Sequence, residues 1–256
     1  MDTTTLGDRI KNYENSCDTN IIGRLPIIIR ADGKNFSRWT KAAKFVKPFD
    51  KDLLEAMAHA MRTTAEKIDG CKFAFTQSDE ITFVLRNDQS LESTPWFGNR
   101  VQKICSVVAS MISVHFNRWY GTALAPAYFD TRVFAVPNIT EAINSIVWRQ
   151  NDAVKNSVSA ACYYEVAKVT GKKTARKLMH KLNRKQQQEL LFKQTGINWN
   201  DYPIKFKRGV GCSRVERIVT INGEDCQRSA WEVEYELPTF AKEQQYLKDI
   251  LRVEEE

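Results

Sequence analysis

The sequence predicts an α+β protein, and three features of the chain lead to this class. Short apolar strands and longer helical patterns occur in the order strand, helix, strand, strand, helix, strand over residues 25–136. A largely helical stretch follows, and Asn222-Gly223 then marks a terminal β-hairpin because Asn-Gly favours a tight turn. The first six elements follow the ferredoxin-like βαββαβ order, which gives a four-stranded antiparallel sheet with both helices on one face.

The first strand and helix of this unit lie within residues 25–70. The polar residues 1–24 are expected to include a short helix over 6–13. The apolar run at 25–31 predicts a buried strand, and a long connection rich in basic and aromatic residues is expected over 32–50. Apolar residues then recur at three- and four-residue steps and predict a helix from residue 49 to about 69: Leu53, Leu54, Met57, Ala58, Met61 and Ala65.

The second half of the unit begins with a central hairpin at residues 71–86. Phe73 and Phe75 alternate with polar residues before a polar turn, and Ile81 and Phe83 alternate after it. A loop at 87–95 is followed by an apolar stripe that predicts a long helix from 96 to 120. Residues 131–136 predict the fourth strand, which Pro137 closes.

The C-terminal half is expected to be helical before it ends in a hairpin. Asn138 and Glu141 form a capping-box pattern that opens a helix over 138–150, and a second helix is predicted over 151–170. The hairpin strands are placed at 215–221 and 230–237, before an amphipathic helix at 241–251. We therefore divide the chain into residues 1–137 and residues 138–256, and expect the two parts to pack as one unit.

A basic run occupies residues 172–185, with seven Lys and Arg residues in fourteen positions. Such a run can form a phosphate-binding face, since polyanions bind clustered cations. A solvated helix surface explains the same pattern, and the sequence leaves the two interpretations equally open.

Composition narrows the class of protein. The chain has 256 residues, 43% of them hydrophobic, and a formal net charge of +7, which favours polyanionic partners such as nucleic acid. The six cysteines show no CxxC spacing and the three histidines are scattered, so thiolate zinc sites and a histidine-centred triad are unsupported. No apolar window of about 18 residues occurs, and we expect a cytoplasmic protein without a membrane segment.

Three acidic residues stand at the ends of predicted strands. Asp32 directly follows the first strand, and Asp79 and Glu80 lie at the turn of the central hairpin. Acidic hairpin turns are most often only solvated turns. In the predicted topology, however, these strand ends are neighbours, and two carboxylates can hold a pair of magnesium ions ~3.5–4 Å apart for phosphoryl or nucleotidyl transfer.

Six stretches of the chain resemble, in order and with compatible spacing over about residues 5–215, the histidine tRNA guanylyltransferases and their bacterial, archaeal and phage relatives. The stretches are Arg30-Ala31-Asp32-Gly33-Lys34-Asn35-Phe36, Phe45-Val46-Lys47-Pro48 with Asp50, Gln77-Ser78-Asp79-Glu80-Ile81-Thr82-Phe83, Phe129-Asp130-Thr131-Arg132-Val133, Trp148-Arg149-Gln150-Asn151-Asp152, and Phe206-Lys207-Arg208-Gly209. The resemblance implies that residues 1–137 are a catalytic domain like a nucleotide polymerase palm. It also implies addition of guanylate to the tRNA 5′ end in the 3′–5′ direction, after a nucleotide, typically ATP, activates the 5′ phosphate. The 3′ hydroxyl of GTP then attacks, and pyrophosphate is removed from the new end.

The resemblance also assigns residues to roles. It implies that Asp32 and Asp79, with the Gly33 carbonyl, bind two Mg²⁺ ions, and that Glu80 is a neighbouring catalytic acid. Residues implied to bind the nucleotides are Asn35, Phe36, Lys47, Asp50, Ser78, Arg100 and Lys103, the last two lying on one face at the start of the 96–120 helix. Residues implied to contact tRNA or support the site are Arg132, Arg149 and Asn156. Family members assemble as tetramers, so a homotetramer is expected.

The chain also departs from the family pattern. Eukaryotic members carry His-Ile-Asn-Asn-Leu-Tyr-Asn where this chain reads Val154-Lys155-Asn156-Ser157-Val158-Ser159-Ala160, and only Asn156 matches. Ser37 replaces a frequent histidine. Relatives that rebuild truncated tRNA 5′ ends against the opposite strand as template share such departures, so templated repair stays open beside guanylate addition to histidine tRNA. A nucleotide cyclase on the same palm and a non-catalytic RNA-binding protein are more distant alternatives.

Overall fold

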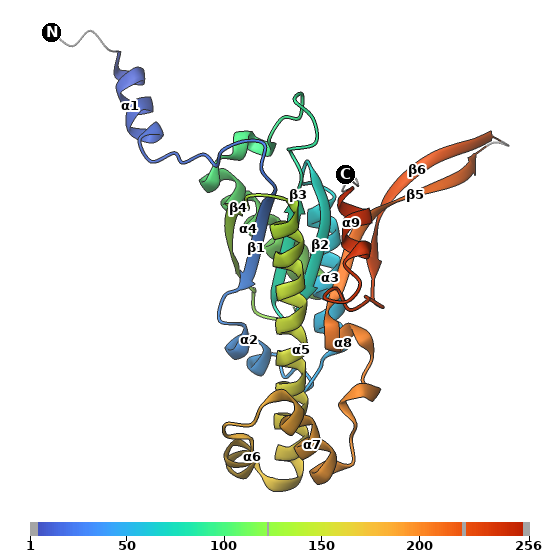
Figure 1. Cartoon of the computed structure of the whole chain (residues 1–256). Helices are drawn as coiled ribbons and strands as arrows, with labels where there is room; N and C mark the ends of the chain where they lie inside the picture. Colours follow the sequence, from blue (N-terminus) through green and yellow to red (C-terminus); the bar gives the residue numbers. More distant parts are fainter. Residues whose placement is uncertain (1–4, 122, 222–223, 253–256) are drawn as a thin grey trace.

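The computed structural model describes residues 5–121, 123–221 and 224–252, and its architecture is a mixed α+β fold on one sheet (Figure 1). The strands are β1 (Ile27–Gly33), β2 (Cys71–Gln77), β3 (Glu80–Leu85), β4 (Phe129–Ala135), β5 (Val210–Ile221) and β6 (Glu224–Glu234). The α-helices are α1 (Leu6–Asn15), α2 (Phe36–Ala42), α3 (Lys51–Ala65), α4 (Val101–Tyr120), α5 (Ile139–Thr170), α6 (Lys172–Met179), α7 (Arg184–Thr195), α8 (Ile204–Arg208) and α9 (Gln245–Leu251). The predicted α+β class with an antiparallel sheet is confirmed.

The strand order in the sheet is β4-β1-β3-β2-β5-β6, with antiparallel pairing between the described neighbours. The first four strands in this order come from residues 1–137, as the sequence predicts. The sheet is larger than the expected four strands, because β5 pairs with β2 through Val210–Ser213 and β6 follows β5. The far part of the β5–β6 ribbon projects from the body of the molecule (Figure 1).

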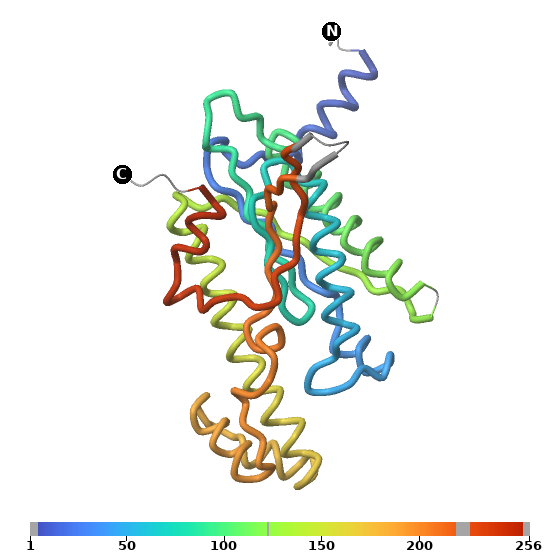
Figure 2. The backbone as a smooth tube through the Cα atoms, turned by 90° about the vertical axis from the view of Figure 1, so that its right-hand side faces the viewer, coloured from blue at the N-terminus to red at the C-terminus, as the bar shows by residue number. Residues whose placement is uncertain are grey.

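Helices cover both faces of the sheet, and the alternation along β1 shows how the two layers are separated. Ile29 and Ala31 pack in a core with α3 and α4, whereas Ile28 packs in a second core with α5 and α9. All three residues are at most 1% exposed, because β1 has strands on both sides as well as helices above and below. Figure 2 shows α3 and α4 on one side of the sheet and α5 and α9 on the other.

Helix α5 is one continuous helix of 32 residues, which corrects the expected division into two helices at residue 150. Neither glycine nor proline occurs between Ile139 and Thr170, so nothing in the chain interrupts the hydrogen-bond ladder. Asn138 caps the helix by accepting a hydrogen bond from the Glu141 amide, and Gly171, with a φ of 83°, ends it. The lower part of α5 carries α6 and α7, which pack against it around Ala161 and Leu191.

Three further boundaries differ from the sequence expectation. The supposed connection at 32–50 contains α2, because Phe36 and Thr40 lie four residues apart and are both buried. The long helix begins at residue 101 and not at 96, since Phe97 and Gly98 have left-handed φ angles of 51° and 60°. The terminal hairpin begins earlier than expected, with strands at 210–221 and 224–234; its expected Asn222-Gly223 turn lies outside the described residues.

The short helix near the N-terminus and the helix at 51–65 are confirmed within a few residues of their expected ends. Among the described residues, no helix combines the length and apolar character needed to cross a membrane. The division of the chain at residue 137 stays a prediction, although strands from both sides of that position share the sheet.

Candidate active site

The carboxylates of the first strand and the central hairpin meet at one end of the sheet. Asp32 lies directly opposite Glu80 on β3 and opposite Asp130 on β4. The β2–β3 hairpin turns through a two-residue loop, Ser78-Asp79, and the carbonyl of Asp79 accepts a 3.0 Å hydrogen bond from the amide of Gly33. The convergence of Asp32 and Asp79 that the sequence predicts is therefore built into the backbone.

Both carboxyl groups have a raised pKa. For Asp32 the largest cause is burial, followed by the negative charges of Glu80 and Asp130. For Asp79 burial is again the largest cause, and Asp32 adds repulsion, while a 2.9 Å hydrogen bond from the Ser78 hydroxyl opposes the shift. Neither Asp32 nor Asp79 forms an ion pair within the described part of the chain. Two neighbouring carboxylates without an ion-pair partner suit a divalent cation.

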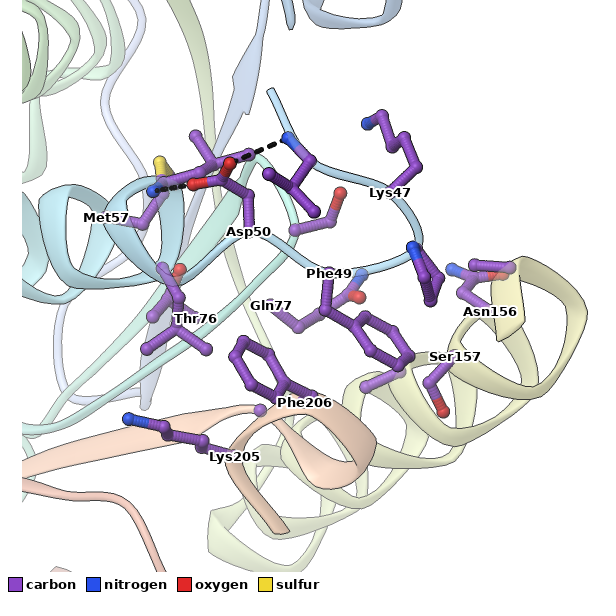
Figure 3. Close-up of a pocket in the computed structure, with 18 residues that line it drawn as sticks. Lys47, Phe49, Asp50, Met57, Thr76, Gln77, Asn156, Ser157, Lys205 and Phe206 are labelled. Atoms are coloured by element: carbon purple, nitrogen blue, oxygen red, sulfur yellow. Dashed lines mark hydrogen bonds between the residues drawn. The ribbon is translucent and has the colours of Figure 1, made fainter. Parts of the chain in front are cut away.

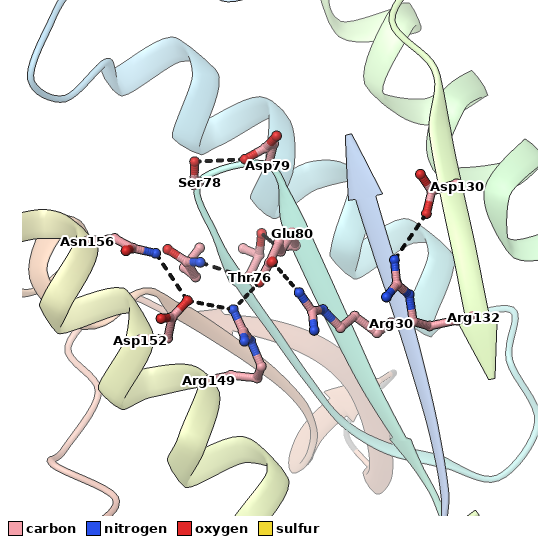
Figure 4. Close-up of polar contacts among 11 residues, drawn as sticks. Arg30, Thr76, Ser78, Asp79, Glu80, Asp130, Arg132, Arg149, Asp152 and Asn156 are labelled. Atoms are coloured by element: carbon pink, nitrogen blue, oxygen red, sulfur yellow. Dashed lines mark hydrogen bonds and ion pairs between the residues drawn. The ribbon is translucent and has the colours of Figure 1, made fainter. Parts of the chain in front are cut away.

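Unlike Asp32 and Asp79, Glu80 is paired with two arginines, and Figure 4 shows its contacts. One carboxylate oxygen accepts a hydrogen bond from Arg30 at 2.5 Å, and the other accepts one from Arg149 on α5. Arg149 also donates to Asp152 at 2.9 Å, and Asn156 donates to the same Asp152 oxygen at 3.1 Å. We call Arg30, Glu80, Arg149, Asp152 and Asn156 the arginine–carboxylate network; it fastens α5 to the hairpin that carries Asp79.

Gly33 follows Asp32 at a place where no larger residue fits. A Cβ atom there would lie 2.2 Å from the ring of Phe36, so the close approach of that ring requires glycine. Phe36 itself is 3% exposed and packs against Trp39, Phe116 and Phe129 at centroid distances of 5.0–5.5 Å. The ring of Phe36 therefore belongs to an aromatic core behind the carboxylates, and the expected nucleotide contact of this residue stays a prediction.

A pocket of about 160 Å³ opens beside the hairpin turn (Figure 3). Four of the predicted site residues line it: Lys47, Asp50, Ser78 and Asn156. Its wall is largely apolar, and Phe49 and Phe206 stack there with their ring centroids 5.2 Å apart at 10°. A pocket with an apolar wall and a few polar groups at its rim has the composition of a small-ligand site.

Asp50 and Lys47, the two polar residues predicted to bind the nucleotide in the 45–50 segment, make different contacts. Asp50 caps α3: one oxygen accepts from the Leu53 amide at 2.9 Å and the other accepts from the Val46 amide at 2.8 Å. Lys47 is half-buried, with its ammonium 5.9 Å from the centroid of the Tyr164 ring. Asp50 therefore shapes the loop, while Lys47 keeps a cation at the pocket rim that can meet a phosphate.

Arg100 and Lys103 lie away from this centre. Residue 100 bridges Asn20, ahead of β1, whereas Asp32 lies at the other end of that strand. Arg100 is the N-cap residue of α4 and pairs with Asp18 at 2.6 Å, and the Lys103 ammonium lies 4.5 Å from the Phe97 ring centroid. A single chain thus does not bring these two residues to the carboxylates, and Arg100 precedes the helix on which the sequence placed it.

The three remaining predicted site residues, Asn35, Arg132 and Arg149, differ in exposure. Asn35 is exposed, with a left-handed φ of 57° before α2, and it does not line the pocket. Arg132 is exposed on β4, 3.7 Å from Asp130. Arg149 is only 4% exposed and pairs with Glu80 and Asp152, which favours its predicted role as a support of the site, while a tRNA contact stays a prediction.

Sequence reasoning assigned no role to several residues that the structure places here. Arg30 stands beside the predicted metal residues in the chain, and Asp152 follows Arg149 at the i,i+3 spacing that lets helix side chains meet. Gly209, with a φ of 81°, packs so closely on β2 that a Cβ would lie 2.7 Å from the Thr76 carbonyl oxygen. The motif stretches contained these residues, but their partners are 50 or more positions away for Arg30 and Gly209.

Comparisons with known proteins agree with this geometry. A sequence profile described as tRNAHis guanylyltransferase matches residues 7–137, and a profile described as Thg1 C terminal domain matches residues 142–251. A solved bacterial tRNA(His) guanylyltransferase (Thg1)-like protein in complex with ATP is 35% identical, with a TM-score of 0.82, covering 96% of this chain and 99% of that chain. A solved protein of the same description in complex with GTP is 33% identical, with a TM-score of 0.76, and covers 98% and 100%. The tRNA(His) guanylyltransferase of Saccharomyces cerevisiae is 28% identical over 214 residues, which are 79% of this chain and 88% of the yeast protein.

Proposed function

The chain belongs to the tRNAHis guanylyltransferase family, and from this premise we propose that it transfers guanylate to the 5′ end of tRNA(His) in the 3′–5′ direction. The observation that carries the proposal is the meeting of Asp32 and Asp79 at adjacent strand ends beside a pocket. Two-metal nucleotidyl transfer needs two carboxylates placed in this way.

The donor set at these strand ends fits Mg²⁺. Asp32 and Asp79 offer oxygen ligands whose mutual repulsion a divalent cation would relieve. No cluster of three or more His, Cys, Asp or Glu side chains that could hold a metal occurs among the described residues, so few protein ligands would be used and phosphates and water would complete the shell, as is usual for Mg²⁺. When bound, the ions lower the pKa of the attacking hydroxyl and neutralise the triphosphate.

The residues of the chain take distinct parts in the proposed reaction. Asp32, Asp79 and the Gly33 carbonyl would hold the ions, and Glu80, which accepts hydrogen bonds from Arg30 and Arg149, would act as the neighbouring acid. The pocket beside Ser78 receives a nucleotide, with the Lys47 ammonium near its phosphates. The bound ATP and GTP of the two solved relatives support these nucleotides as substrates, and within this proposal ATP or GTP activates the 5′ phosphate while GTP supplies the guanylate.

A palm-like arrangement of the first four strands and a homotetramer also belong to this proposal. The strand order β4-β1-β3-β2 with α3 and α4 on one face supports the palm. Family membership supports the tetramer, and light scattering tests it: a monomeric mass would contradict it.

The function is tested with Mg²⁺, ATP and labelled GTP on two RNAs, a full-length tRNA(His) with a 5′ monophosphate and a tRNA that lacks its first nucleotide. We expect label on the full-length tRNA(His) and none with Asp79→Ala. Extension of the truncated RNA alone would replace guanylate addition with templated repair. Incorporation into neither RNA, with equal RNA binding by wild type and variant, would contradict both, and a cyclic nucleotide product would indicate a cyclase.

A further inference from the structure

Beside the candidate active site, one strip of the sheet lacks a helical cover. Arg132 lies opposite Arg30, and Phe134 lies opposite Ile28, whose side chain packs under α5. Cross-strand partners point to the same face, so Arg132 and Phe134 also face the α5 side of the sheet. They stand one strand further out, on the edge strand β4, and are 57% and 40% exposed.

Helix α5 borders this strip with an exposed tryptophan. Trp148 is 58% exposed, although the two residues that follow it are buried. The guanidinium carbon of Arg149 lies 4.4 Å from the centroid of the Trp148 ring, and that of Arg30 lies 5.8 Å from it. Both arginines are held by Glu80, so the ring rests on a fixed support and keeps a large exposed surface.

Exposed aromatic rings next to an exposed arginine are the combination that binds single-stranded nucleic acid. Each unpaired base stacks on an aromatic face whatever its identity, and the arginine meets the backbone phosphates. The strip is continuous with the candidate active site. Asp130 precedes Arg132 by two residues on the same face of β4, and it lies opposite Asp32. An occupant of this strip would therefore lie next to the candidate active site, where the proposed function brings the 5′ end of the RNA.

We propose that Trp148, Phe134 and Arg132 form a stacking surface for the unpaired nucleotides at the 3′ end of the tRNA acceptor stem. This inference rests on the proposed function, which brings the 5′ phosphate to Asp32 and Asp79. In tRNA the unpaired 3′ nucleotides continue the strand opposite that 5′ end. Holding them on the strip would orient the acceptor stem and direct the 5′ phosphate toward the carboxylates.

The test is equilibrium binding of the full chain to two forms of tRNA(His), one with and one without its unpaired 3′ nucleotides. We expect Trp148→Ala to bind the tailed form roughly tenfold more weakly, as for loss of one stacked base, and the tailless form as wild type does. Phe134→Ala should act in the same direction, and Trp148→Phe should retain most of the affinity. Trp119→Ala is the matched control, since Trp119 is 46% exposed on α4, the helix layer of the other face.

Equal losses on both RNA forms, or failure of Trp148→Phe to retain binding, would overturn the stacking surface. A change of oligomeric state in Trp148→Ala would also overturn it, because the strip would then be covered by a second copy of the chain. A tail-dependent loss in a protein that transfers no guanylate would support the surface while contradicting the proposed function, so the two failures are separable.

Discussion

Replacing Arg149 with methionine tests whether the arginine–carboxylate network holds α5 on the β2–β3 hairpin. The Arg149 side chain is 5% exposed and joins Glu80 of β3 to Asp152 of its own helix. Methionine has similar length, favours helix and adds no charge, so Arg149→Met removes the two ionic contacts and leaves α5 intact. We expect a large loss of stability for this variant.

The size of the loss follows from the partners that remain. Hydrogen bonds to charged groups contribute about 1.5–3 kcal/mol each, and Arg149 makes two. Glu80 keeps its contact with Arg30, and Asp152 is 31% exposed to water, so we take the lower value for each and expect a total of about 3 kcal/mol. For a chain of this size, about 2–4 °C per kcal/mol gives a fall in the unfolding midpoint of about 6–12 °C.

Thermal unfolding at neutral pH measures this effect, with Arg132→Met as the matched control. Arg132 is 57% exposed and lies 3.7 Å from Asp130, so its loss should cost less than about 1 kcal/mol. A double-mutant cycle with Glu80→Gln should show coupling, because one contact is shared. If Arg149→Met melted like the control, or if the two substitutions were simply additive, the network would not hold the two elements together.

Three further predictions concern the carboxylates, a glycine and the pocket. Burial and, to a smaller degree, Asp32 raise the pKa of Asp79 in the folded protein, so without metal the free energy of unfolding falls as pH rises through that pKa. In EDTA at about pH 7.5, Asp79→Asn should therefore be more stable than wild type in urea unfolding, and at about pH 3 it should lose this advantage. Gly209→Ala should lower the free energy of unfolding by about 3 kcal/mol, since its Cβ would lie 2.7 Å from a β2 carbonyl oxygen. Gly196→Ala, with open space around it, should lower it by only about 1 kcal/mol, and equal losses for the two variants in chemical denaturation would refute this prediction. Lys47→Met should raise the nucleotide KM roughly tenfold with little change in kcat, and an unchanged KM in steady-state assays would remove Lys47 from the pocket's phosphate contacts.

The sheet and the meeting of its carboxylates were accessible from the sequence, because local patterns determine them. Alternating residues such as Phe73 and Phe75 and the apolar run at 27–29 fix strands and buried faces. Once the order of elements is known, few topologies remain, and in the predicted one Asp32 and Asp79 are neighbours.

The rest depends on contacts between distant parts of the chain. Arg149 belongs to a polar stretch, and no local pattern shows that it is buried and paired with Glu80, 69 positions away. Phe36 lies in a basic segment three positions after Gly33, and its place in the aromatic core depends on Phe116 and Phe129. Family resemblance names such positions, but only the packing tells a ligand contact from a structural one.

Because α5 is unbroken, its helical rotation fixes three regions of the protein relative to one another. Within this single helix, Arg149 contacts Glu80 of the β2–β3 hairpin, Ser157 lines the pocket and Ala161 packs against α6 and α7. Adding or deleting one residue between these points would turn everything beyond it by about 100° and shift it by about 1.5 Å. Changes of length in this family should therefore accumulate in the loops and in the projecting ribbon, while α5 varies only by substitution.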